Sequence, residues 1–455
     1  MIEGQLALAM FVVVCGILLL GFPVALTLGG TALGFAALGI VMGHFDASYL
    51  TALTGRIFGT MSNETLVAVP LFILMGVVLE RAKIAEDLLA NLAGMFGALP
   101  GGLGLAVILV GALLAASTGI VGATVVTMGV LALPTMLRAG YQPQLAAGTI
   151  CATGTLGQII PPSIALVLLG DTMSSAYQQA QLKMNIVNTQ TVSVGDLFVG
   201  AVVPGIVLVF LYLAYVLIRA TLQPNSAPPA EVKKTDIRSV VTAVLPPLGL
   251  IGLVLGSILV GAATPTEAAG VGAVGALLLA LSRGALTLRV LHDISQSTLF
   301  TTSMVFLILI GAALFSLVFR GFGGDTMIES FFEALGGGPH TALLIVMLVM
   351  FLLGFILDFI EITFVVVPVV GPILLAMGFD PVWLGIMIAV NLQTSFLTPP
   401  FGFALFYLRG VAPDTVSTAA IYSGVLPFVL IQLLLLALMW WWPNLVLWLP
   451  GVMGR

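Results

Sequence analysis

Two segments of the sequence interrupt long apolar stretches with paired prolines, and polar residues that could bind an ion flank both. The pairs are Pro161-Pro162 in IIPPS (159–163) and Pro399-Pro400 in LTPPF (397–401). A proline inside a helix costs about 3 kcal/mol, because it removes a backbone hydrogen bond and clashes with the preceding turn. In hydrocarbon no water repairs that loss. Each break therefore predicts carbonyl oxygens free to coordinate a cation and amides free to attract an anion.

Small, hydroxyl and amide residues stand next to both breaks. They are Thr153, Gly154, Thr155, Gly157 and Ser163 near the first break, and Asn391, Gln393, Thr394, Ser395 and Thr398 near the second. The simpler interpretation of one such break is a proline kink that neighbouring helices repair. Two breaks with similar flanks favour a binding function over this interpretation.

Two pairs of apolar segments are joined by turns too short for ordinary loops between membrane spans. Ser117-Thr118-Gly119 joins 101–117 to 119–138, and Leu357-Asp358 joins 341–356 to 359–377. Such short turns predict two helical hairpins that each enter and leave the membrane on one side. Backbone of this kind is tolerated where protein or a water-filled cavity surrounds it.

The second turn is acidic. It carries Asp358, and Glu361 follows three residues later on the same helical face. Acids inside a membrane are functional by default, as cation ligands or proton carriers. The alternative is that backbone amides at a helix N-terminus satisfy both carboxylates. The sequence leaves both roles open, and the two can coexist.

The elements that position these residues are membrane spans. The chain has 455 residues, of which 60% are hydrophobic and only 7% are charged, whereas soluble domains carry about 25% charged residues. The first apolar run follows MIEGQ without a basic residue, so we expect a retained span and not a signal peptide. Neither Cys15 nor Cys151 suggests a disulfide or a metal site. Spans are predicted near 5–20, 23–42, 63–80, 101–117, 119–138, 144–170, 196–219, 240–260, 267–282, 298–319, 341–356, 359–377, 383–408 and 418–442.

The placement of basic residues supports this map with the N-terminus outside. If both hairpins are re-entrant, ten of the fourteen lysines and arginines fall on the cytoplasmic side, as the positive-inside rule expects. These are Arg81, Lys83, Arg138, Arg219, Lys233, Lys234, Arg238, Arg283, Arg289 and Arg409, while Arg56, Lys183, Arg320 and Arg455 fall outside.

An internal repeat relates the two breaks. PTMLRAGYQP (134–143) followed by IIPPS reappears as PILLAMGFDP (372–381) followed by LTPPF, with the offset 399 − 161 = 238. Four prolines in register are hard to obtain by chance at about 5% usage. The span map gives the two copies opposite orientations, which predicts an inverted repeat. This architecture is typical of secondary transporters with a binding site near the membrane midplane.

Sequence signatures of enzymes are lacking. No lysine follows a glycine as in a Walker A motif, and the three histidines have no HExxH spacing. Energy for transport must then come from an ion gradient or from another subunit. One local motif is structural: in ATPTEAAG (263–270), Thr264 and Glu267 predict a capping box with Pro265 at the first helical position.

Together these motifs resemble the large membrane subunit of tripartite ATP-independent periplasmic (TRAP) transporters, the DctM-like family. The resemblance is carried by GFPVALTLGG (21–30), ASTGIVGATVVTMG (116–129), GTLGQIIPPSIALVLLG (154–170), GAATPTEAAG (261–270), LDFIEITFVVVPVVGP (357–372) and NLQTSFLTPPFGFALF (391–406). It covers nearly the whole chain. It implies an all-α polytopic membrane protein with an inverted-repeat elevator-type fold, built from two re-entrant hairpins and two broken helices.

The resemblance also implies ligands and partners. It implies Na⁺ as the coupling ion with no tightly bound cofactor, a small DctQ-like membrane subunit, a periplasmic DctP-like binding protein, membrane lipid, and no nucleic acid. Its sodium ligands would be Ser117, Gly119, Thr153, Gly154, Thr155, Asp358, Asn391, Gln393 and Thr394, and its substrate-binding residues Ser117, Thr118, Gly119, Ser163 and Thr398. The location implied is the bacterial inner membrane.

The fold implied divides the chain into alternating scaffold and transport segments. They are scaffold helices in 1–100, the first transport repeat in 101–170, an external loop in 171–195, a scaffold helix in 196–219, a cytoplasmic linker in 220–238, scaffold helices in 239–338, the second transport repeat in 339–410 and a C-terminal helix in 411–455.

The leading hypothesis is Na⁺-coupled uptake of small organic acid anions such as dicarboxylates or 2-oxo and hydroxy acids. The alternative within transport is a stand-alone Na⁺ or H⁺/carboxylate symporter that needs no binding protein. From other classes, a membrane enzyme would require a reactive cluster that the sequence lacks. A channel would conduct without saturation or Na⁺ dependence.

Overall fold

The chain folds into helices that are long and apolar enough to cross a membrane. The computed structural model describes residues 2–186, 190–230 and 235–454, and these contain helices and no strand. Seven helices in this part of the chain qualify as spans by length and composition, and two bent helix pairs, Ser48–Met61 with Thr65–Arg81 and Phe359–Val365 with Val367–Ala376, add up to two more. The all-α polytopic membrane fold predicted from the sequence is therefore confirmed.

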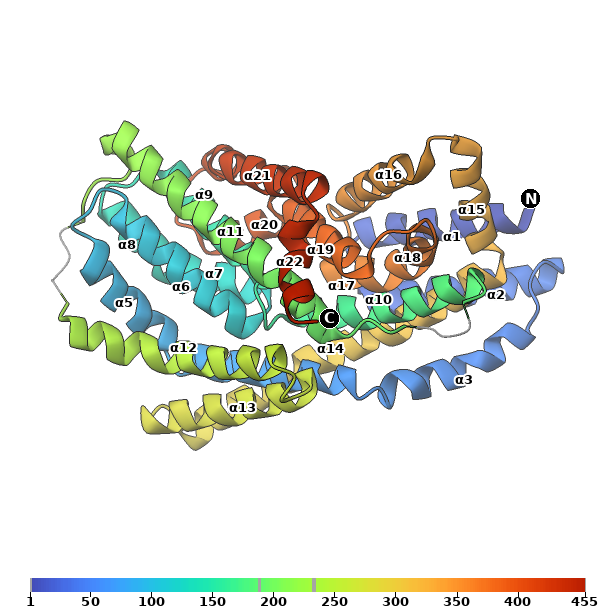
Figure 1. Ribbon diagram of the computed structural model, residues 1–455, viewed down its shortest axis with the longest axis horizontal. Coiled ribbons are helices and arrows are strands. Elements are labelled where there is room, and N and C mark those ends of the chain that lie inside the picture. Colours follow the sequence, from blue (N-terminus) through green and yellow to red (C-terminus); the bar gives the residue numbers. More distant parts are fainter. Residues whose placement is uncertain (1, 187–189, 231–234, 455) are drawn as a thin grey trace. The chain divides into compact units, whose positions relative to one another are not determined.

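The helices follow one another with short connections (Figure 1). Those of the first half are α1 (Ile2–Leu19), α2 (Val24–Met42), α3 (Ser48–Met61), η1 (Thr65–Val67), α4 (Ala68–Arg81), α5 (Ile84–Phe96), α6 (Gly102–Thr118), α7 (Val121–Leu131), α8 (Leu133–Arg138), α9 (Pro143–Thr155), η2 (Leu156–Gln158), α10 (Ile164–Lys183), α11 (Val194–Leu222) and η3 (Pro224–Ser226). Those of the second half are α12 (Ile237–Leu259), α13 (Pro265–Ser282), α14 (Leu288–Gly321), α15 (Gly324–Leu335), α16 (Gly338–Leu353), α17 (Phe359–Val365), α18 (Val367–Ala376), α19 (Pro381–Leu397), α20 (Phe403–Val411), α21 (Thr418–Trp441) and α22 (Asn444–Val452).

The repeat found in the sequence recurs in the order of these elements. A hairpin of α6 with α7 and α8 precedes the broken helix α9–α10, and a hairpin of α16 with α17 and α18 precedes the broken helix α19–α20. The second hairpin helix begins at Val121 in one copy and Phe359 in the other, and 359 − 121 = 238. Both helices break where the sequence predicts, since no helix covers the prolines at 161–162 or 399–400.

The chain forms two compact units. Unit 1 comprises Met1–Leu66, Leu168–Ser193 and Phe300–Leu384, and unit 2 comprises Val67–Val167, Val194–Leu299 and Gly385–Arg455. This division does not test which segments form the scaffold and which form the transport domain, so that assignment stays a prediction.

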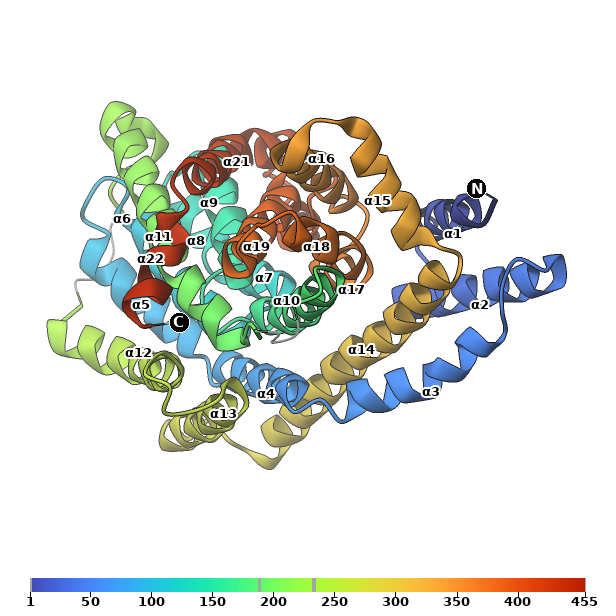
Figure 2. The same ribbon diagram turned by 45° about the vertical axis from the view of Figure 1, so that its right-hand side comes forward.

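Within unit 2, α9 is the central helix. It packs against α6, α7, α20 and α21 (Figure 1). Glycines permit the closest of these approaches: a Cβ atom added at Gly148 would lie 2.1 Å from the carbonyl oxygen of Gly424 on α21. At the periphery of the same unit, α13 runs alongside α4 (Figure 2).

Within unit 1, α15 packs on α1 and on α18, while α16 and α17 both pack on α18 (Figure 2). The short hairpin helices α17 and α18 meet at a bend of 58°. The hairpin that carries Asp358 buries apolar side chains of its own helix α17, such as Phe359 and Ile362.

Hydropathy missed several helices. The structure adds α3, α5, α15 and α22, which are short or amphipathic, to the predicted spans. It also corrects the segment predicted as an external loop at 171–195, because α10 continues to Lys183 and α11 begins at Val194. Of the described residues in this segment, only 184–186 and 190–193 lack a helix. The helical part, SSAYQQAQLK, is polar, yet alanine, glutamine, leucine and lysine all favour helices. Residues 187–189 lie outside the described residues.

The predicted capping box is present at the start of α13. The backbone amide of Glu267 donates to Thr264 Oγ1 (3.3 Å), and Glu267 Oε2 accepts from the amide of Thr264 (2.8 Å). Pro265 occupies the first turn. Two orphan amides of the helix are satisfied in this way.

Removing this cap should have a small, local effect. Thr264→Ala is expected to lower the free energy of unfolding by about 1 kcal/mol, since one helical amide loses its acceptor. Thermal unfolding of the purified protein measures the change. Thr264→Ser keeps the hydroxyl and should retain the stability of the parent chain; equal losses in both variants would contradict a capping role.

Candidate functional site

The first hairpin tip lies against the first helix break. Helix α6 is followed by its C-cap Gly119, whose φ of +62° is in the left-handed region. A Cβ atom added there would lie 2.9 Å from the backbone nitrogen of Ile164, the first residue of α10. A Cβ atom added at Gly157 would lie 3.5 Å from the carbonyl oxygen of Ala115. Backbone of the tip and backbone of the break therefore meet without intervening side chains.

The predicted hydroxyl residues around this tip are buried and donate within their own segments. Ser117 Oγ donates to Leu114 O (2.9 Å), Thr153 Oγ1 to Thr149 O (2.6 Å), and Ser163 Oγ to Gly157 O (2.8 Å). Each hydroxyl donates its hydrogen bond to a backbone carbonyl, so the lone pairs of the hydroxyl oxygen stay available as acceptors. Such oxygens can coordinate a cation without losing a hydrogen bond. The side chain of Thr118 lies outside the described residues.

Glycines bring α9 close to both hairpin helices. A Cβ atom added at Gly154 would lie 2.2 Å from Val125 Cγ2 on α7, and one added at Gly111 on α6 would lie 1.9 Å from Thr153 Cγ2. The structure thus places Gly119 beside Ile164 and Gly157 beside Ala115, whereas Thr153 lies against Gly111, about two helical turns before the tip. Whether these residues bind an ion stays a prediction.

The second hairpin tip contains a capping box. Asp358 caps α17: its Oδ1 accepts from the amide of Phe359 (2.6 Å), and Glu361 Oε2 accepts from the amide of Asp358 (2.9 Å). Glu361 is only 5% exposed. The capping role that the sequence left open is therefore present. It occupies some of the carboxylate lone pairs, and the remaining ones leave a role in ion binding possible.

The two tips differ chemically at equivalent positions. The N-cap of α7 is Ile120, which provides no side-chain cap, whereas the N-cap of α17 is the carboxylate of Asp358. The positions correspond, since 358 − 120 = 238. The second tip therefore carries a carboxyl group at a position where the first tip carries an apolar side chain.

The polar residues of the second break up to Ser395 lie buried in α19, whereas Thr398, just past the end of that helix, is half-buried. Thr394 Oγ1 donates to Val390 O (2.8 Å), Ser395 Oγ to Leu392 O (3.0 Å), and Thr398 Oγ1 to Thr394 O (2.7 Å). Asn391 is 5% exposed. These residues belong to unit 2, whereas Asp358 belongs to unit 1. Their grouping with Asp358 into one site stays a prediction.

A buried polar cluster joins the two repeats inside unit 2. Gln393 Nε2 donates to Thr155 Oγ1 (3.4 Å), and Gln432 Nε2 on α21 donates to the same oxygen (3.4 Å) and to Tyr212 OH (2.8 Å). All four residues are fully buried. Thr155 and Gln393 are repeat equivalents, because 393 − 155 = 238. Residues related by a two-fold axis can touch only beside that axis, so the cluster marks the axis of the repeat.

This cluster contains oxygen atoms that lack donors. Gln393 Oε1 and Gln432 Oε1 are buried and make no hydrogen bond within the described part of the chain, and the same holds for Gln158 Oε1 on η2. An unsatisfied buried carbonyl oxygen costs about 1–3 kcal/mol. A bound cation would remove this cost.

Sequence reasoning named Thr155 and Gln393 but assigned them to separate half-sites, and it missed Gln432 and Tyr212. A signal for Gln432 existed, since it is a lone amide in a 24-residue apolar helix. Polar residues in such helices face the bundle interior and mark sites. The constant offset of the repeat identifies Thr155 and Gln393 as equivalent positions, but the contact between them is seen only in the structure.

Apolar spans, two hairpins and two broken helices with buried polar groups define a multi-pass transporter permease of the bacterial inner membrane. Residues 11–445 match the family described as "Tripartite ATP-independent periplasmic transporter, DctM component", and the chain belongs to this family. Such a component works with a small DctQ-type membrane subunit and a periplasmic binding protein.

Relatives of known name agree with this assignment. The chain is 30% identical to the C4-dicarboxylate TRAP transporter large permease protein DctM of Vibrio cholerae, over 98% of this chain and 97% of the relative. It is 32% identical to the protein of the same name from Pseudomonas aeruginosa, over 90% and 92%. It is 28% identical to the sialic acid TRAP transporter large permease protein SiaM of Vibrio cholerae, over 96% of each chain.

A solved structure shares the fold. The crystal structure of the Alcanivorax borkumensis YdaH transporter aligns with a TM-score of 0.62 and 18% identity, covering 88% of this chain and 90% of that chain.

Proposed function

We propose that this chain is the large permease of a Na⁺-coupled TRAP transporter, which imports small organic acid anions by an elevator mechanism with its N-terminus in the periplasm. The observation that carries the proposal is the buried cluster of Thr155, Gln393 and Gln432 on the repeat axis. Its amide oxygens have no donors among the described residues. Ion-coupled transporters of inverted-repeat architecture bind their ions at such positions near the midplane.

The chemistry of the cluster suits Na⁺ better than an anion. Thr155 Oγ1 donates to Ala152 O (2.8 Å) and so faces the cluster as an acceptor, as do the free oxygens of Gln393 and Gln432. Neutral oxygen ligands are typical of Na⁺ sites in transporters with broken helices. A cation bound at the repeat axis would contact both copies of the repeat and thereby couple them.

Several relatives support the anion class, whereas two others are named for ectoine, which is a zwitterion. Those named above carry the names of C4-dicarboxylates and of sialic acid, and a further relative, from Oleidesulfovibrio alaskensis, is named an isethionate TRAP transporter permease protein. All three are organic anions with a carboxylate or sulfonate group. The proposal therefore specifies a small organic anion and leaves its identity to the binding protein.

Exchange of the driving ion tests the proposal. The permease is reconstituted in liposomes with its small membrane subunit and its binding protein, and uptake of the anion carried by that protein is measured. Uptake should require an inward Na⁺ gradient and should fall to the level of empty liposomes when K⁺ replaces Na⁺. Uptake that is unchanged in K⁺ would remove Na⁺ coupling from the proposal.

Asp358→Asn separates the two roles of the acidic tip. Asparagine caps a helix as well as aspartate does, so the unfolding temperature should stay near that of the parent chain. If the charge contributes to ion binding, the Na⁺ concentration for half-maximal uptake should rise severalfold. Glu267→Gln is the matched control, because it keeps the capping box of α13 and should not change Na⁺ dependence. Unaltered Na⁺ dependence in Asp358→Asn would restrict Asp358 to capping.

A further inference from the structure

Unit 1 contains a cavity with polar residues in its wall. None of the ion-binding or substrate-binding residues predicted from the sequence lies in this wall. The cavity has a volume of about 330 Å³, and α3, α10, α14 and the hairpin helices α17 and α18 form its walls. Cavities that hold small ligands range from about 300 to 1,000 Å³. This one is large enough for a small organic molecule.

The lining of the cavity carries excess positive charge. Two arginines, Arg56 and Arg320, and one acid, Asp171, line it, which gives 2 − 1 = +1. Asp171 makes no ion pair with either arginine; instead its Oδ1 accepts from Asn63 Nδ2 (2.8 Å). The carboxylate is thus held by a neutral amide, and it does not neutralise Arg56, which has no ion pair among the described residues.

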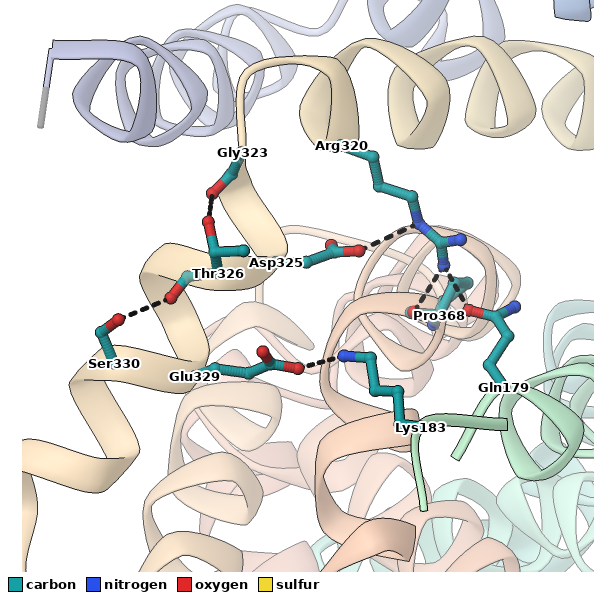
Figure 3. Close-up of polar contacts among 9 residues, drawn as sticks. All are labelled: Gln179, Lys183, Arg320, Gly323, Asp325, Thr326, Glu329, Ser330 and Pro368. Carbon is teal, nitrogen blue, oxygen red and sulfur yellow. Dashed lines mark hydrogen bonds and ion pairs between the residues drawn. The ribbon is translucent and has the colours of Figure 1, made fainter. Parts of the chain in front are cut away.

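Arg320 is fixed in place by surrounding groups (Figure 3). Its Nη2 donates to Gln179 Oε1 (2.9 Å) and to Pro368 O (3.0 Å), and its Nε lies 3.4 Å from Asp325 Oδ2. Next to it, Lys183 pairs with Glu329. These contacts hold the Arg320 guanidinium rigidly and leave its Nη1 without a hydrogen bond in the described part of unit 1.

Arg56 differs, since its guanidinium makes no ion pair and no hydrogen bond with any described residue. The residue is half-buried on α3. Burying an unpaired charge is costly, and a guanidinium presents a planar fork that matches a carboxylate or sulfonate. Ser316, only 5% exposed, adds a hydroxyl to the cavity that has no partner in the described structure.

We infer that this cavity binds the carboxylate or sulfonate group of a small organic anion, with Arg56 as its direct partner and Arg320 as a fixed second cation. The inference rests on the proposed function, which supplies such an anion as cargo. Both arginines belong to the group that the sequence map predicts on the outer side, where a periplasmic protein would deliver the anion. The cavity is separate from the predicted sodium ligands.

Anion binding to the permease tests the inference directly. The chain is purified with its small membrane subunit, and its unfolding temperature is followed during titration with succinate, and separately with isethionate, at constant Na⁺. At least one of these anions should stabilise the parent protein, because a ligand that binds only the folded state raises its stability. Arg56→Gln should raise the apparent Kd roughly 10- to 100-fold, the usual effect of losing a charge-assisted hydrogen-bonded pair. Arg56→Lys keeps the positive charge but not the planar guanidinium, so its apparent Kd should lie between those of the parent chain and Arg56→Gln.

Arg289→Gln is the matched control. Arg289 is exposed on α14 and makes no ion pair with a described residue, so its variant should bind both anions like the parent chain. Equal binding by Arg56→Gln and the parent chain would overturn the inference, and so would binding of neither anion by the parent chain. If Arg56→Gln lost only its affinity for the binding protein, Arg56 would be a protein-docking residue and the inference would be wrong.

The same proteins separate this inference from the proposed function. Anion binding that depends on Arg56, together with uptake that proceeds in K⁺, would retain the cavity and remove Na⁺ coupling. Na⁺-dependent uptake by the parent chain, together with unimpaired anion binding in Arg56→Gln, would support Na⁺ coupling and exclude the cavity as the anion site.

Discussion

Gly148→Ala is expected to destabilise the folded protein by about 1–3 kcal/mol or more, the usual cost of overpacking, and to abolish uptake. The added methyl would lie 2.1 Å from the carbonyl oxygen of Gly424 and 2.5 Å from its carbonyl carbon. Both are backbone atoms, which cannot rotate away as the end of a side chain can. Helix α9 would therefore have to move away from α21. Because α9 also carries Thr153–Thr155, this movement would displace the predicted ion ligands.

Thermal unfolding in detergent and uptake by proteoliposomes measure the two effects. Gly424→Ala tests the same contact from α21, since its methyl would lie 2.0 Å from the carbonyl oxygen of Gln144. Gly252→Ala on α12 is the control, because no atom lies within 4 Å of the added methyl. That variant should be neutral or slightly stabilised, as alanine favours a helix interior over glycine. A Gly148→Ala protein as stable as Gly252→Ala would contradict the close packing of α9 on α21.

Gln393→Leu is expected to remove the Na⁺-dependent part of the protein's stability while leaving the rest intact. In K⁺ the parent chain buries Gln393 Oε1 without a donor, and Gln393 Nε2 makes only a long hydrogen bond of 3.4 Å to Thr155. Replacing so poorly satisfied an amide by an apolar side chain of similar size can be neutral or stabilising. In Na⁺, however, the variant lacks one proposed ligand.

The measurement is the unfolding temperature in NaCl and in KCl at equal ionic strength. The parent chain should be more stable in NaCl, and Gln393→Leu should show the same stability in both salts. Gln181→Leu is the matched control, because Gln181 is also buried but has both amide atoms satisfied by Gln190 (2.8 and 2.7 Å). It should lose equal stability in both salts. A Gln393→Leu protein that keeps the full Na⁺ effect would exclude Gln393 as a ligand.

Local signals in the sequence predicted the backbone framework well. The helix breaks followed from Pro161 and Pro399, because proline acts on its own helix wherever that helix lies. The capping box of Thr264 and Glu267 followed for the same reason, since its hydrogen bonds join residues three apart. Hydropathy located the long spans but not α5, whose buried Leu88 and Leu92 alternate with the exposed Glu86 and Asp87. Its helical periodicity was readable, but its 13 residues are too few to cross a membrane.

Long-range contacts were the part that could not be predicted from composition. Nothing near Thr155 in the sequence indicates that a glutamine of α21 contacts it, because that contact spans 277 residues. The cavity around Arg56 is similar, since its walls come from α3, α10, α14 and the second hairpin. Counting charges assigned Arg56 and Arg320 to one side of the membrane. That both arginines line the same cavity depends on how distant helices pack, and no local sequence pattern indicates this packing.

The contact between Thr155 and Gln393 bears on how a chain of this kind can descend from a duplicated half. In a protein made of two identical halves, a position beside the symmetry axis faces its own copy, so its residue must pair with itself. Two threonines would bring no amide oxygen to the axis, and two glutamines could exchange reciprocal amide hydrogen bonds. The present unlike pair does neither: threonine supplies no hydrogen to the amide, and the Gln393 oxygen is left over. Divergence at a single self-facing position is thus enough to create an acceptor that two identical halves would not contain.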